Sequence, residues 1–307
     1  MMLKKLMDEA FKQNLKDFIE LVKEVTKTLS KETKYGSNIE FYGKLAKIKA
    51  CGKIIFVGDL HGDLESLVYI LKKSNFIKRA KENKDVLMIF LGDYGDRGPF
   101  SVEVYYLVLK LKENFPDKIL MLRGNHEGPD DLLAYPHDLP FQLNQRFGDS
   151  GKEAYKVLRG LFNELLNAVL VKERCLVVHG GIPANANKVE DFAFAHERHP
   201  NETLLEEILW SDPYEGIRGT IPSPRGAGKL FGSDVTMRVL ERLGVNFLVR
   251  GHEPCDNGFK LNHGGKVLTF FSRKGPPYFN NYAAYLEVDL SEKFNDGKEL
   301  IPFIVRF

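Results

Sequence analysis

The sequence predicts an α/β fold, and two observations carry that prediction. Short apolar runs typical of strands alternate with segments of helical spacing between residues 53 and 250. Strand-like runs then become more frequent up to residue 306. The hydrophobic content of 43% and the charged content of 28% are those of a soluble globular protein. We therefore expect one main domain, residues 46–307, with residues 1–45 as a helical extension packed on it.

The N-terminal segment, MMLKKLMDEAFKQNLKDFIELVKEV, has apolar residues at helical spacing and charged residues throughout. It lacks the uninterrupted apolar stretch of a signal peptide. Acidic residues on its polar face favour packing on the domain over binding to a membrane surface. Because no apolar run of the chain approaches the ~20 residues that span a bilayer, we expect no membrane partner.

The remaining elements follow a polar stretch at 30–38. Apolar runs bounded by glycine and polar residues predict strands, and apolar spacings of three and four predict helices. The expected strands are 53–58, 86–91, 118–123, 174–179, 246–250, 266–272, 283–289 and 301–306. The expected helices are 63–74, 100–114, 151–167 and 233–243. The Pro- and Gly-rich stretches at 220–229 and 273–278 are expected to be ordered loops.

Charge and cysteine usage argue against several classes of protein. The net charge is +2 and there is no basic stripe, so nucleic acid is not an expected partner. The three cysteines, Cys51, Cys175 and Cys255, form no CxxC pair, which argues against a zinc ribbon or a redox dithiol. An odd number of cysteines favours reduced structural thiols and hence a cytoplasmic location.

Polar residues follow the apolar runs at several predicted strand ends. In α/β sheets, ligands bind beyond the carboxyl ends of the strands, so these residues are candidates for chemistry. The first such segment is GDLHG at 58–62. Residues i and i+2 of an extended chain point the same way, so Asp59 and His61 can share one metal ion. For either residue alone, a cap or turn role is the alternative.

The next strand end carries GDYGDRG at 92–98. If the two strands are neighbours, Asp93 brings a second carboxylate to the same edge, where a divalent cation would remove the repulsion between like charges. Arg97 is suited to clamp a phosphate, because a guanidinium matches phosphate oxygens in bidentate fashion. A surface ion pair between Asp96 and Arg97 is the alternative.

The segment GNHE at 124–127 follows the apolar run KILMLR. The amide oxygen of Asn125 is a neutral metal ligand, whereas the adjacent His126 points differently and is suited to protonate a leaving group. Asp96 is the natural acid partner to hold the His126 ring and raise its pKa. Glu127 is expected to be structural, either turning the loop or pairing with an arginine.

Two further histidines end apolar runs, His179 in VHGG and His252 in VRGHE. Two Asp, one Asn and three His at successive strand ends together predict a metal site. Mixed nitrogen and oxygen ligands suit Mn, Fe or Zn, and two ions ~3.5–4 Å apart form a pair that hydrolyses phosphoesters. The other histidines lack this setting and are expected to be surface or loop residues: His137, His196, His199 and His263.

The ordered motifs GDxHG, GDxxDRG, GNHE, HGG and RxH resemble the PPP family of metal-dependent serine/threonine phosphatases, which includes protein phosphatases 1 and 2A and calcineurin. The resemblance covers roughly residues 50–290. It implies a calcineurin-like metallophosphoesterase fold, in which helices flank a central β-sandwich in four layers. It also implies phosphoserine and phosphothreonine proteins as substrates, with the regulatory partner unknown.

The resemblance implies two divalent metal ions, expected to be manganese, with iron or zinc as alternatives. Asp93 would bridge the two ions, and a hydroxide between them would attack phosphorus directly and in line. The first ion would be bound by Asp59, His61 and Asp93, and the second by Asp93, Asn125, His179 and His252.

The resemblance also implies roles for residues that touch the substrate. His126 with Asp96 would be the general acid pair. Arg97 and Arg225 would neutralise charge on the phosphate oxygens, where Arg225 comes from the SPRGAG segment after WSDP. Tyr278 would be the counterpart of the tyrosine that ends a family loop near the active site.

The sequence departs from the family at two places. Gly95 stands where the eukaryotic enzymes usually carry valine, a change expected to loosen that turn. The loop Ser272-Arg-Lys-Gly-Pro-Pro-Tyr278 is longer and more basic than its family counterpart. Arg273 and Lys274 either favour acidic phosphopeptides or are solvated loop charges.

Two other functions compete with a protein phosphatase. A dinucleoside-polyphosphate hydrolase would use the same two metals on a pyrophosphate linkage. A non-catalytic scaffold that binds phosphoproteins would need neither an intact set of ligands nor an intact acid pair. The presence of both Asp96 and His126 argues against the scaffold.

Overall fold

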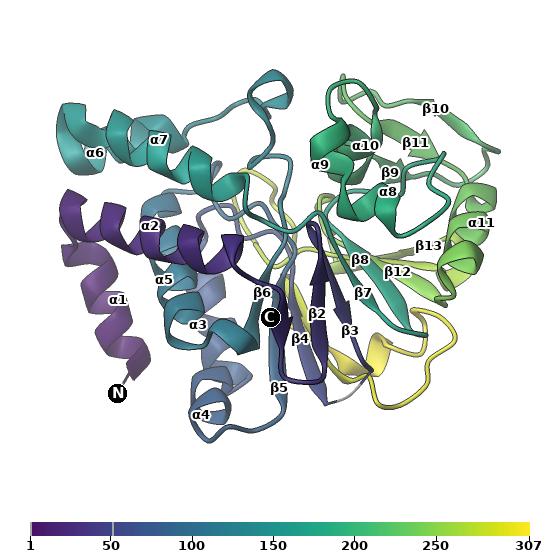
Figure 1. Cartoon of the computed structure of the whole chain (residues 1–307), viewed down its shortest axis with the longest axis horizontal. Helices are drawn as coiled ribbons and strands as arrows, with labels where there is room; N and C mark the ends of the chain where they lie inside the picture. Colours follow the sequence, from purple (N-terminus) through teal and green to yellow (C-terminus); the bar gives the residue numbers. More distant parts are fainter. Residues whose placement is uncertain (1, 51) are drawn as a thin grey trace.

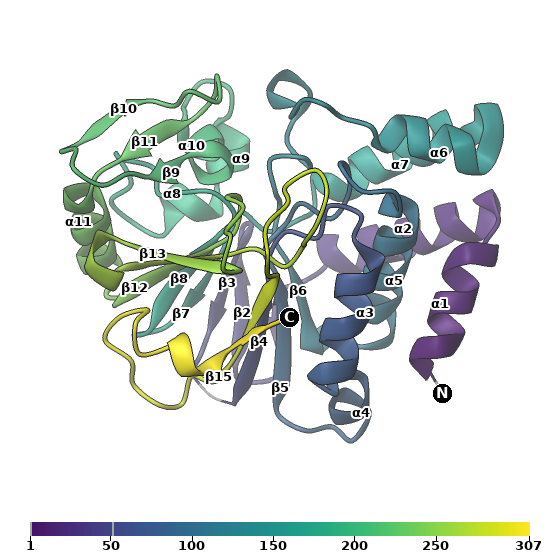
Figure 2. The ribbon, with the colours of Figure 1, turned by 180° about the vertical axis from the view of Figure 1, so that it is seen from behind.

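The computed structural model describes residues 2–50 and 52–307. Within these residues the strands form sheets of eight, five and three strands. The two larger sheets lie against each other in the middle of the molecule, and helices cover both outer faces (Figure 1). The reverse view shows the same layers, with the strands of both sheets between the two groups of helices (Figure 2). The predicted α/β class with a central β-sandwich flanked by helices is confirmed.

The eight-stranded sheet has the order β1-β2-β3-β7-β8-β12-β14-β13, the five-stranded sheet β16-β15-β4-β5-β6, and the small sheet β10-β11-β9. The strands are β1 Lys34–Tyr35, β2 Ile39–Tyr42, β3 Leu45–Ile48, β4 Lys53–Val57, β5 Val86–Phe90, β6 Ile119–Met121, β7 Ala168–Val171, β8 Cys175–Val178, β9 Asp212–Pro213, β10 Thr220–Pro222, β11 Lys229–Phe231, β12 Phe247–Arg250, β13 Phe259–Asn262, β14 Val267–Phe270, β15 Ala284–Asp289 and β16 Ile304–Arg306. The α-helices are α1 Met2–Lys12, α2 Leu15–Ser30, α3 Leu64–Lys73, α4 Phe76–Lys81, α5 Ser101–Asn114, α6 Leu139–Phe147, α7 Gly151–Phe162, α8 Glu190–Ala193, α9 Ala195–Arg198, α10 Leu204–Trp210 and α11 Ser233–Leu243.

The central strands send alternate side chains into two different cores. In β4, Ile55 packs among helices α1 to α7, whereas Phe56 packs between the two large sheets. In β8, Val177 faces the five-stranded sheet and Val178 faces the layer of α8 to α11. Burial on both faces explains why these strands read as continuous apolar runs rather than as alternating ones.

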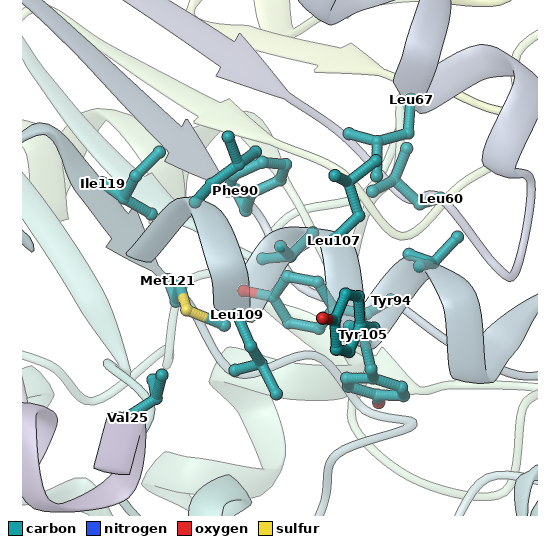
Figure 3. Close-up of a cluster of buried hydrophobic side chains, with 14 of the residues drawn as sticks. Val25, Leu60, Leu67, Phe90, Tyr94, Tyr105, Leu107, Leu109, Ile119 and Met121 are labelled. Carbon is teal, nitrogen blue, oxygen red and sulfur yellow. The ribbon is translucent and has the colours of Figure 1, made fainter. Parts of the chain in front are cut away.

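Figure 3 shows the core between the five-stranded sheet and its helices. Phe90 of β5, Met121 of β6 and Leu107 of α5 belong to this cluster, together with Val25 of α2. Full burial of such a side chain contributes roughly 1.5–3 kcal/mol. The N-terminal helices are therefore part of the core that supports β5 and β6.

The N-terminal extension begins with two helices, α1 and α2. Asn14 caps α2 by accepting a hydrogen bond from the N–H of Asp17 at 2.9 Å, which separates α2 from α1. After α2, β1 pairs with β2 and β2 pairs with β3 in the eight-stranded sheet, and none of these three strands was expected. The division of the chain at residue 45 stays a prediction, although the sheet takes strands from both sides of that position. No helix within the described residues is long and apolar enough to cross a bilayer.

The expected strands are found within a few residues of their predicted bounds, but one expected helix is too long. The helix predicted for 151–167 ends at Phe162, and the last residues of the run lead into β7 at Ala168. An apolar run of this length does not distinguish a helix from a buried strand. The 301–306 segment is a strand only from Ile304 onward, because a 3₁₀ turn precedes it.

Parallel pairing of the strands brings the loops that carry the predicted site residues to one edge of each large sheet. β4 pairs in parallel with β5, and β5 with β6. In the other sheet β8 pairs in parallel with β12. Because the carboxyl ends of parallel neighbours lie side by side, the polar segments that follow these strands start close together.

Lys112 of α5 is fully buried and joins three segments of the chain. Its Nζ donates to the carbonyl oxygens of Pro116 and Ile119, each at 2.8 Å, and forms an ion pair with Glu32. The ring centroid of Tyr35 lies 5.2 Å from the same ammonium group. One charge thus ties the end of α5 to the start of β6 and to the connection between α2 and β1.

We expect Glu32→Ala to lower the free energy of unfolding by about 3–5 kcal/mol, because it leaves the Lys112 ammonium buried without its counter-charge. Urea denaturation followed by circular dichroism measures this change. Glu24→Ala, the same substitution at an exposed position of α2, should change stability by no more than about 0.5 kcal/mol. Equal effects of the two substitutions would contradict the role of this ion pair.

Candidate active site

The loops that follow β4, β5, β6, β8 and β12 meet at one edge of the sandwich. The N–H groups of Leu60 and His61 donate to the carbonyl oxygen of Asp93 at 3.0 and 2.9 Å. Across the second sheet, the N–H of Gly251 donates to the carbonyl of His179 at 3.0 Å. Main-chain hydrogen bonds therefore help to fix the relative positions of the loops, in addition to any contacts of their side chains.

Asp93 lies at the centre of this edge and is almost fully buried. Its Oδ2 is 3.4 Å from Nε2 of His61 and 3.4 Å from Nε2 of His179. Its Oδ1 accepts a hydrogen bond from the N–H of His126 at 3.0 Å. The carboxylate therefore stands between a histidine from the five-stranded sheet and a histidine from the eight-stranded sheet.

Both of these histidines are oriented by the main chain. His61 Nδ1 lies 3.0 Å from the carbonyl oxygen of Gly95, and His179 Nδ1 lies 2.9 Å from that of Leu91. Because Nδ1 donates to a carbonyl, Nε2 faces the cluster, and the neutral ring offers its lone pair there, as in histidines that bind metals. The bond from His179 to Leu91 also connects the two sheets.

The remaining predicted ligands, Asn125, Asp59 and His252, come from both sheets and contact one another or His179. The amide Oδ1 of Asn125 lies 3.0 Å from His179 Nε2 and 3.2 Å from His252 Nδ1. Asp59 accepts a hydrogen bond from the N–H of His252 on Oδ1 at 2.9 Å. Its Oδ2 is buried and has no hydrogen-bond partner among the described residues.

Burial and mutual charge shift the titration of these groups. Burial raises the pKa of Asp59, so this carboxyl binds a proton readily. Burial would raise the pKa of Asp93 too, but the surrounding histidines His179, His126 and His61 together outweigh that effect and lower it. Burial would lower the pKa of His179, but Asp93 raises it to about 9. Burial lowers the pKa of His61 to about 3.

The cluster has the chemistry of a site for metal ions. Two sets of three ligand atoms lie within 4.8 Å of one another and share Asp93: His61, Asp93 and His126, and Asp93, His179 and His252. A buried carboxylate oxygen without a partner, Asp59 Oδ2, is costly to leave unsatisfied, and a cation compensates it. The residues present therefore fit divalent cations.

Backbone strain is concentrated at this edge. Several of its non-glycine residues have positive φ, a conformation that persists only where the surroundings impose it. These residues are His61 at 43°, Asp93 at 54°, Asp96 at 64°, Arg97 at 68° and His252 at 72°. The site thus depends on interactions that hold the loops in place.

Glu127 is one of the groups that hold these loops. Its buried carboxylate accepts hydrogen bonds from the N–H groups of Asp93 at 2.8 Å and Gly124 at 3.1 Å, and from the hydroxyl of Tyr105 at 2.6 Å. Arg123 binds the Glu127 carbonyl through Nε at 2.7 Å rather than the carboxylate. These contacts agree with the expected structural role of Glu127. Its carboxylate holds the loop that contains Asp93 and the loop that contains Gly124 against each other.

The expected partnership of Asp96 with His126 is present, and it has a third member. His126 Nδ1 donates to Asp96 Oδ2 at 2.6 Å, and His137 Nδ1 contacts the same oxygen at 2.7 Å. Burial would raise the pKa of Asp96, but these two histidines hold it far below its usual range. Burial would lower the pKa of His126, but Asp93 and Asp96 raise it. His137 lies in a loop, as predicted, but its contact with Asp96 was not expected.

The other discounted histidines lie away from the cluster. His263 is buried, not exposed, and its Nδ1 lies 2.8 Å from the hydroxyl of Thr236. His196 lies on α9 and contacts Asn167, whereas His199 contacts Asp131. A short sequence window could not identify His263 as buried, since the element that covers it is distant in sequence.

The two predicted phosphate-binding arginines come from opposite sides of the cluster. Arg97 donates from one guanidinium nitrogen to the carbonyl of Tyr135 at 3.0 Å, and its Nε has no partner among the described residues. Arg225 donates from Nε to Asp212 at 2.6 Å and is one-third exposed. Tyr278 lies over His61, with ring centroids 5.4 Å apart.

Asp212 was missed in the sequence, although the WSDP segment that contains it was noticed. This buried carboxylate accepts from Arg225 and also from the fully buried Arg250, the latter at 2.8 Å. Burial would raise the pKa of Asp212, but His252 and the two arginines hold it well below its usual range. Asp212 thus positions Arg225 and lies 3.9 Å from His252 Nε2.

A preference for acidic phosphopeptides stays a prediction, but Arg273 is not a solvated loop charge. Its side chain is buried and donates to the carbonyl oxygens of His61 and Pro276, and its guanidinium lies over the ring of Tyr278. Arg273 therefore fastens the 273–278 loop to the first metal-binding segment. Lys274 is exposed at the surface of the same loop.

Gly95 does not loosen its turn, because neighbouring side chains fill the space beside it. A Cβ on Gly95 would lie 2.8 Å from Cε2 of Tyr105 and 3.3 Å from Cβ of Ser101. The hydroxyl of Tyr105 is fixed by Glu127. The aromatic ring occupies the volume that a larger residue at position 95 would need.

The sequence matches the family of calcineurin-like phosphoesterases over residues 52–256. It is 39% identical to a probable serine/threonine-protein phosphatase of Encephalitozoon cuniculi, over 73% of this chain and 47% of that protein. It is 32% identical to a catalytic subunit of protein phosphatase 2A from Dictyostelium discoideum, over 79% of this chain and 76% of that protein. A solved protein serine/threonine phosphatase from Saccharomyces cerevisiae, with similarity to human phosphatase PP5, has a TM-score of 0.74 at 22% identity and covers 95% of this chain and 88% of its own.

The four-layer fold, the Asp93-centred cluster and the family match define the chain as a calcineurin-like metallophosphoesterase. Within that class it belongs to the PPP family of serine/threonine-protein phosphatases, as its motifs indicated. The chain spans about half the length of the Encephalitozoon relative and about three quarters of the Dictyostelium one.

We expect Gly95→Ala to lower the free energy of unfolding by about 1–3 kcal/mol, because the new methyl group overpacks against the Tyr105 ring. Thermal and urea unfolding measure the change. Gly160→Ala is the matched control, since Gly160 lies on α7 with no atom within 4 Å of its added Cβ. There the substitution should be neutral or stabilising. A Gly95→Ala protein as stable as the control would show that the turn has room.

We expect metal uptake by chelator-stripped protein to release protons and to strengthen as pH rises toward about 9. His179, whose pKa is raised to about 9, and Asp59, whose pKa is also raised, must lose their protons to bind a cation. Calorimetric titration with Mn²⁺ in two buffers of different ionisation enthalpy counts the protons. Uptake without proton release at neutral pH would contradict these protonation states.

Proposed function

We propose that the protein is a metal-dependent phosphatase that removes phosphate from phosphoserine and phosphothreonine in proteins. The observation that supports this most is the position of Asp93, whose Oδ2 lies 3.4 Å from both His61 Nε2 and His179 Nε2. A carboxylate shared by two groups of ligands suits a pair of cations that stabilise both the attacking and the leaving oxygen. The relatives named as serine/threonine-protein phosphatases support the substrate class.

Six residues would hold the two cations, which we propose to be manganese, since mixed nitrogen and oxygen ligands suit that ion as well as iron or zinc. When bound, such ions supply Lewis acidity, lower the pKa of water and neutralise charge on the phosphate. The proposed holders are Asp59, His61, Asp93, Asn125, His179 and His252.

His126 is the proposed proton donor to the departing serine or threonine oxygen. Its Nδ1 is occupied by Asp96 at 2.6 Å, which leaves Nε2 for the substrate. The charges of Asp93 and Asp96 raise its pKa, so the ring carries the proton that it must deliver. An alkoxide is a poor leaving group, and its departure therefore depends on this proton.

Arg97 and Arg225 are the proposed anchors for the phosphate oxygens. The Nε of Arg97 has no partner among the described residues, which leaves a donor for an anion. Asp212 holds Arg225 through Nε and leaves its two terminal nitrogens on the exposed end of the side chain. Tyr278, whose ring lies beside that of His61, is proposed to contact the substrate.

A cytoplasmic location stays a prediction. It is supported by Cys175 and Cys255, which are buried free thiols. Cys51 lies outside the described residues. We propose phosphoproteins as partners, and neither a nucleic acid nor a membrane.

We expect the protein loaded with Mn²⁺ to release phosphate from a phosphothreonine peptide and to lose that activity with a chelator. Asp93→Asn should lower kcat/KM by at least about 10³-fold and reduce bound metal, because one carboxylate serves both cations. Phosphate release and metal analysis on the same samples measure both effects. The matched control is Asp8→Asn, the same change at an exposed position of α1.

Diadenosine tetraphosphate is assayed under the same conditions. A preference for the dinucleotide over the peptide would refute the protein phosphatase in favour of the hydrolase that shares this site. Metal binding without turnover of either substrate would refute both enzymes and favour a phosphoprotein-binding scaffold. Near-normal activity of Asp93→Asn would refute the shared-carboxylate site itself.

A further inference from the structure

His137 contacts the catalytic pair of Asp96 and His126 but has no role in the reaction proposed above. Its Nδ1 lies 2.7 Å from Asp96 Oδ2, the same oxygen that receives the hydrogen bond from His126. Its Nε2 lies 2.8 Å from the hydroxyl of Tyr155 on α7, and the two rings pack with centroids 5.5 Å apart. His137 thus connects the buried acid of the catalytic pair to a helix of the outer layer.

We propose that His137 is a positioning residue for the general acid: held by Tyr155, it fixes the Asp96 carboxylate in the orientation that keeps Nε2 of His126 turned toward the leaving group. This inference rests on the proposed function, because it assigns a partner to the proton donor of that reaction.

Hydrogen-bond accounting supports one arrangement of protons along this chain of groups. Asp96 keeps its negative charge and accepts hydrogen bonds only, so both histidines donate from Nδ1. A neutral His137 then has a lone pair on Nε2, which accepts from the Tyr155 hydroxyl. Asp96 Oδ1 is occupied as well, since it accepts from the N–H of Leu139 at 2.7 Å. The carboxylate thus accepts hydrogen bonds from His126, His137 and the N–H of Leu139. Because these donors lie in three different positions, they hold the carboxylate in a single orientation.

The segment that carries His137 also holds the backbone of the catalytic loop. Asp138 accepts from the N–H of Arg97 at 2.9 Å, and Gln142 binds the carbonyl of Gly98 at 2.8 Å. Asp96 and Arg97 both have positive φ, so their loop needs such external restraint. The stretch from His137 to Gln142 therefore braces the loop through its backbone and its acid through a side chain.

A metal ion at Asp96, His126 and His137 is the competing interpretation, because the three groups lie close together. Nitrogen and oxygen ligands stand ~2.0–2.2 Å from a zinc ion in tetrahedral geometry, which separates the ligand atoms by about 3 Å or more. The separations of 2.6 and 2.7 Å between the ring nitrogens and Asp96 Oδ2 are those of charge-assisted hydrogen bonds. We therefore assign the cluster to hydrogen bonding.

The test compares two aryl phosphates that differ in how much they need a proton donor. Phenyl phosphate has a poor leaving group, whereas p-nitrophenyl phosphate has an acidic one that departs with little assistance. For His137→Phe we expect kcat/KM to fall about tenfold on phenyl phosphate and less than about threefold on p-nitrophenyl phosphate. Tyr155→Phe, which removes only the hydroxyl, should shift the ratio the same way by about threefold.

The control is His199→Phe, the same chemical change at a histidine that contacts Asp131, and it should leave the ratio of the two activities unchanged. Equal losses on both esters in His137→Phe would overturn the proposal, since a merely structural defect lowers both. If His137→Phe does not fold, Tyr155→Phe decides by the same ratio, and an unchanged ratio there overturns the proposal.

Histidine-labelled protein gives a second readout that needs no turnover. Nitrogen-15 spectra should show Nδ1 of His137 protonated in the wild-type protein, and an unprotonated Nδ1 would overturn the proposal. The aryl esters and the spectra are independent of the peptide substrate. Failure to hydrolyse a phosphothreonine peptide would therefore refute the proposed function without deciding the role of His137.

Discussion

Two carboxylates buried at one edge of a β-sandwich, Asp59 and Asp93, are the constraint on which the rest of the structure depends. Buried like charges are unfavourable unless each is compensated. The chain supplies N–H donors to each, from His252 to Asp59 and from His126 to Asp93, and places histidines around Asp93. The compensation from the chain is incomplete at Asp59 Oδ2. Because this oxygen lacks a partner from the chain, the edge of the sandwich suits cations and is more than a network of hydrogen bonds.

The sandwich architecture makes this concentration of charge possible. One sheet alone would present Asp59, Asp93 and Asn125 in a row, with solvent on the open side. The second sheet brings His179 and His252 from the facing layer, and the hydrogen bond from His179 to the carbonyl of Leu91 fixes the distance between the layers. The side chains of the cluster are thereby buried, which strengthens the electrostatic interactions among them.

The loops at this edge have strained backbones, and side chains outside the cluster hold them in place. Glu127 accepts from the N–H groups of two loops, Arg273 fastens a third to His61, and Asp212 holds Arg225 together with Arg250. None of these residues need touch a substrate. Their shared function is to keep the reacting groups within hydrogen-bond distance of where they must act, since catalysis depends on such pre-organisation.

The sequence by itself determined the strands that lead into the site and the chemistry at their ends, because both are encoded within a few neighbouring residues. Apolar runs predicted β4, β5 and β8, and the residue types that follow them predicted a metal site. Only the tertiary structure decided that His137 shares Asp96 with His126, and that Tyr105 fills the space beside Gly95. It also showed that residues 163–167, predicted as the end of a helix, lie outside α7. These features depend on the packing of segments that are distant in sequence. A pattern of neighbouring residues does not specify which distant segments come into contact.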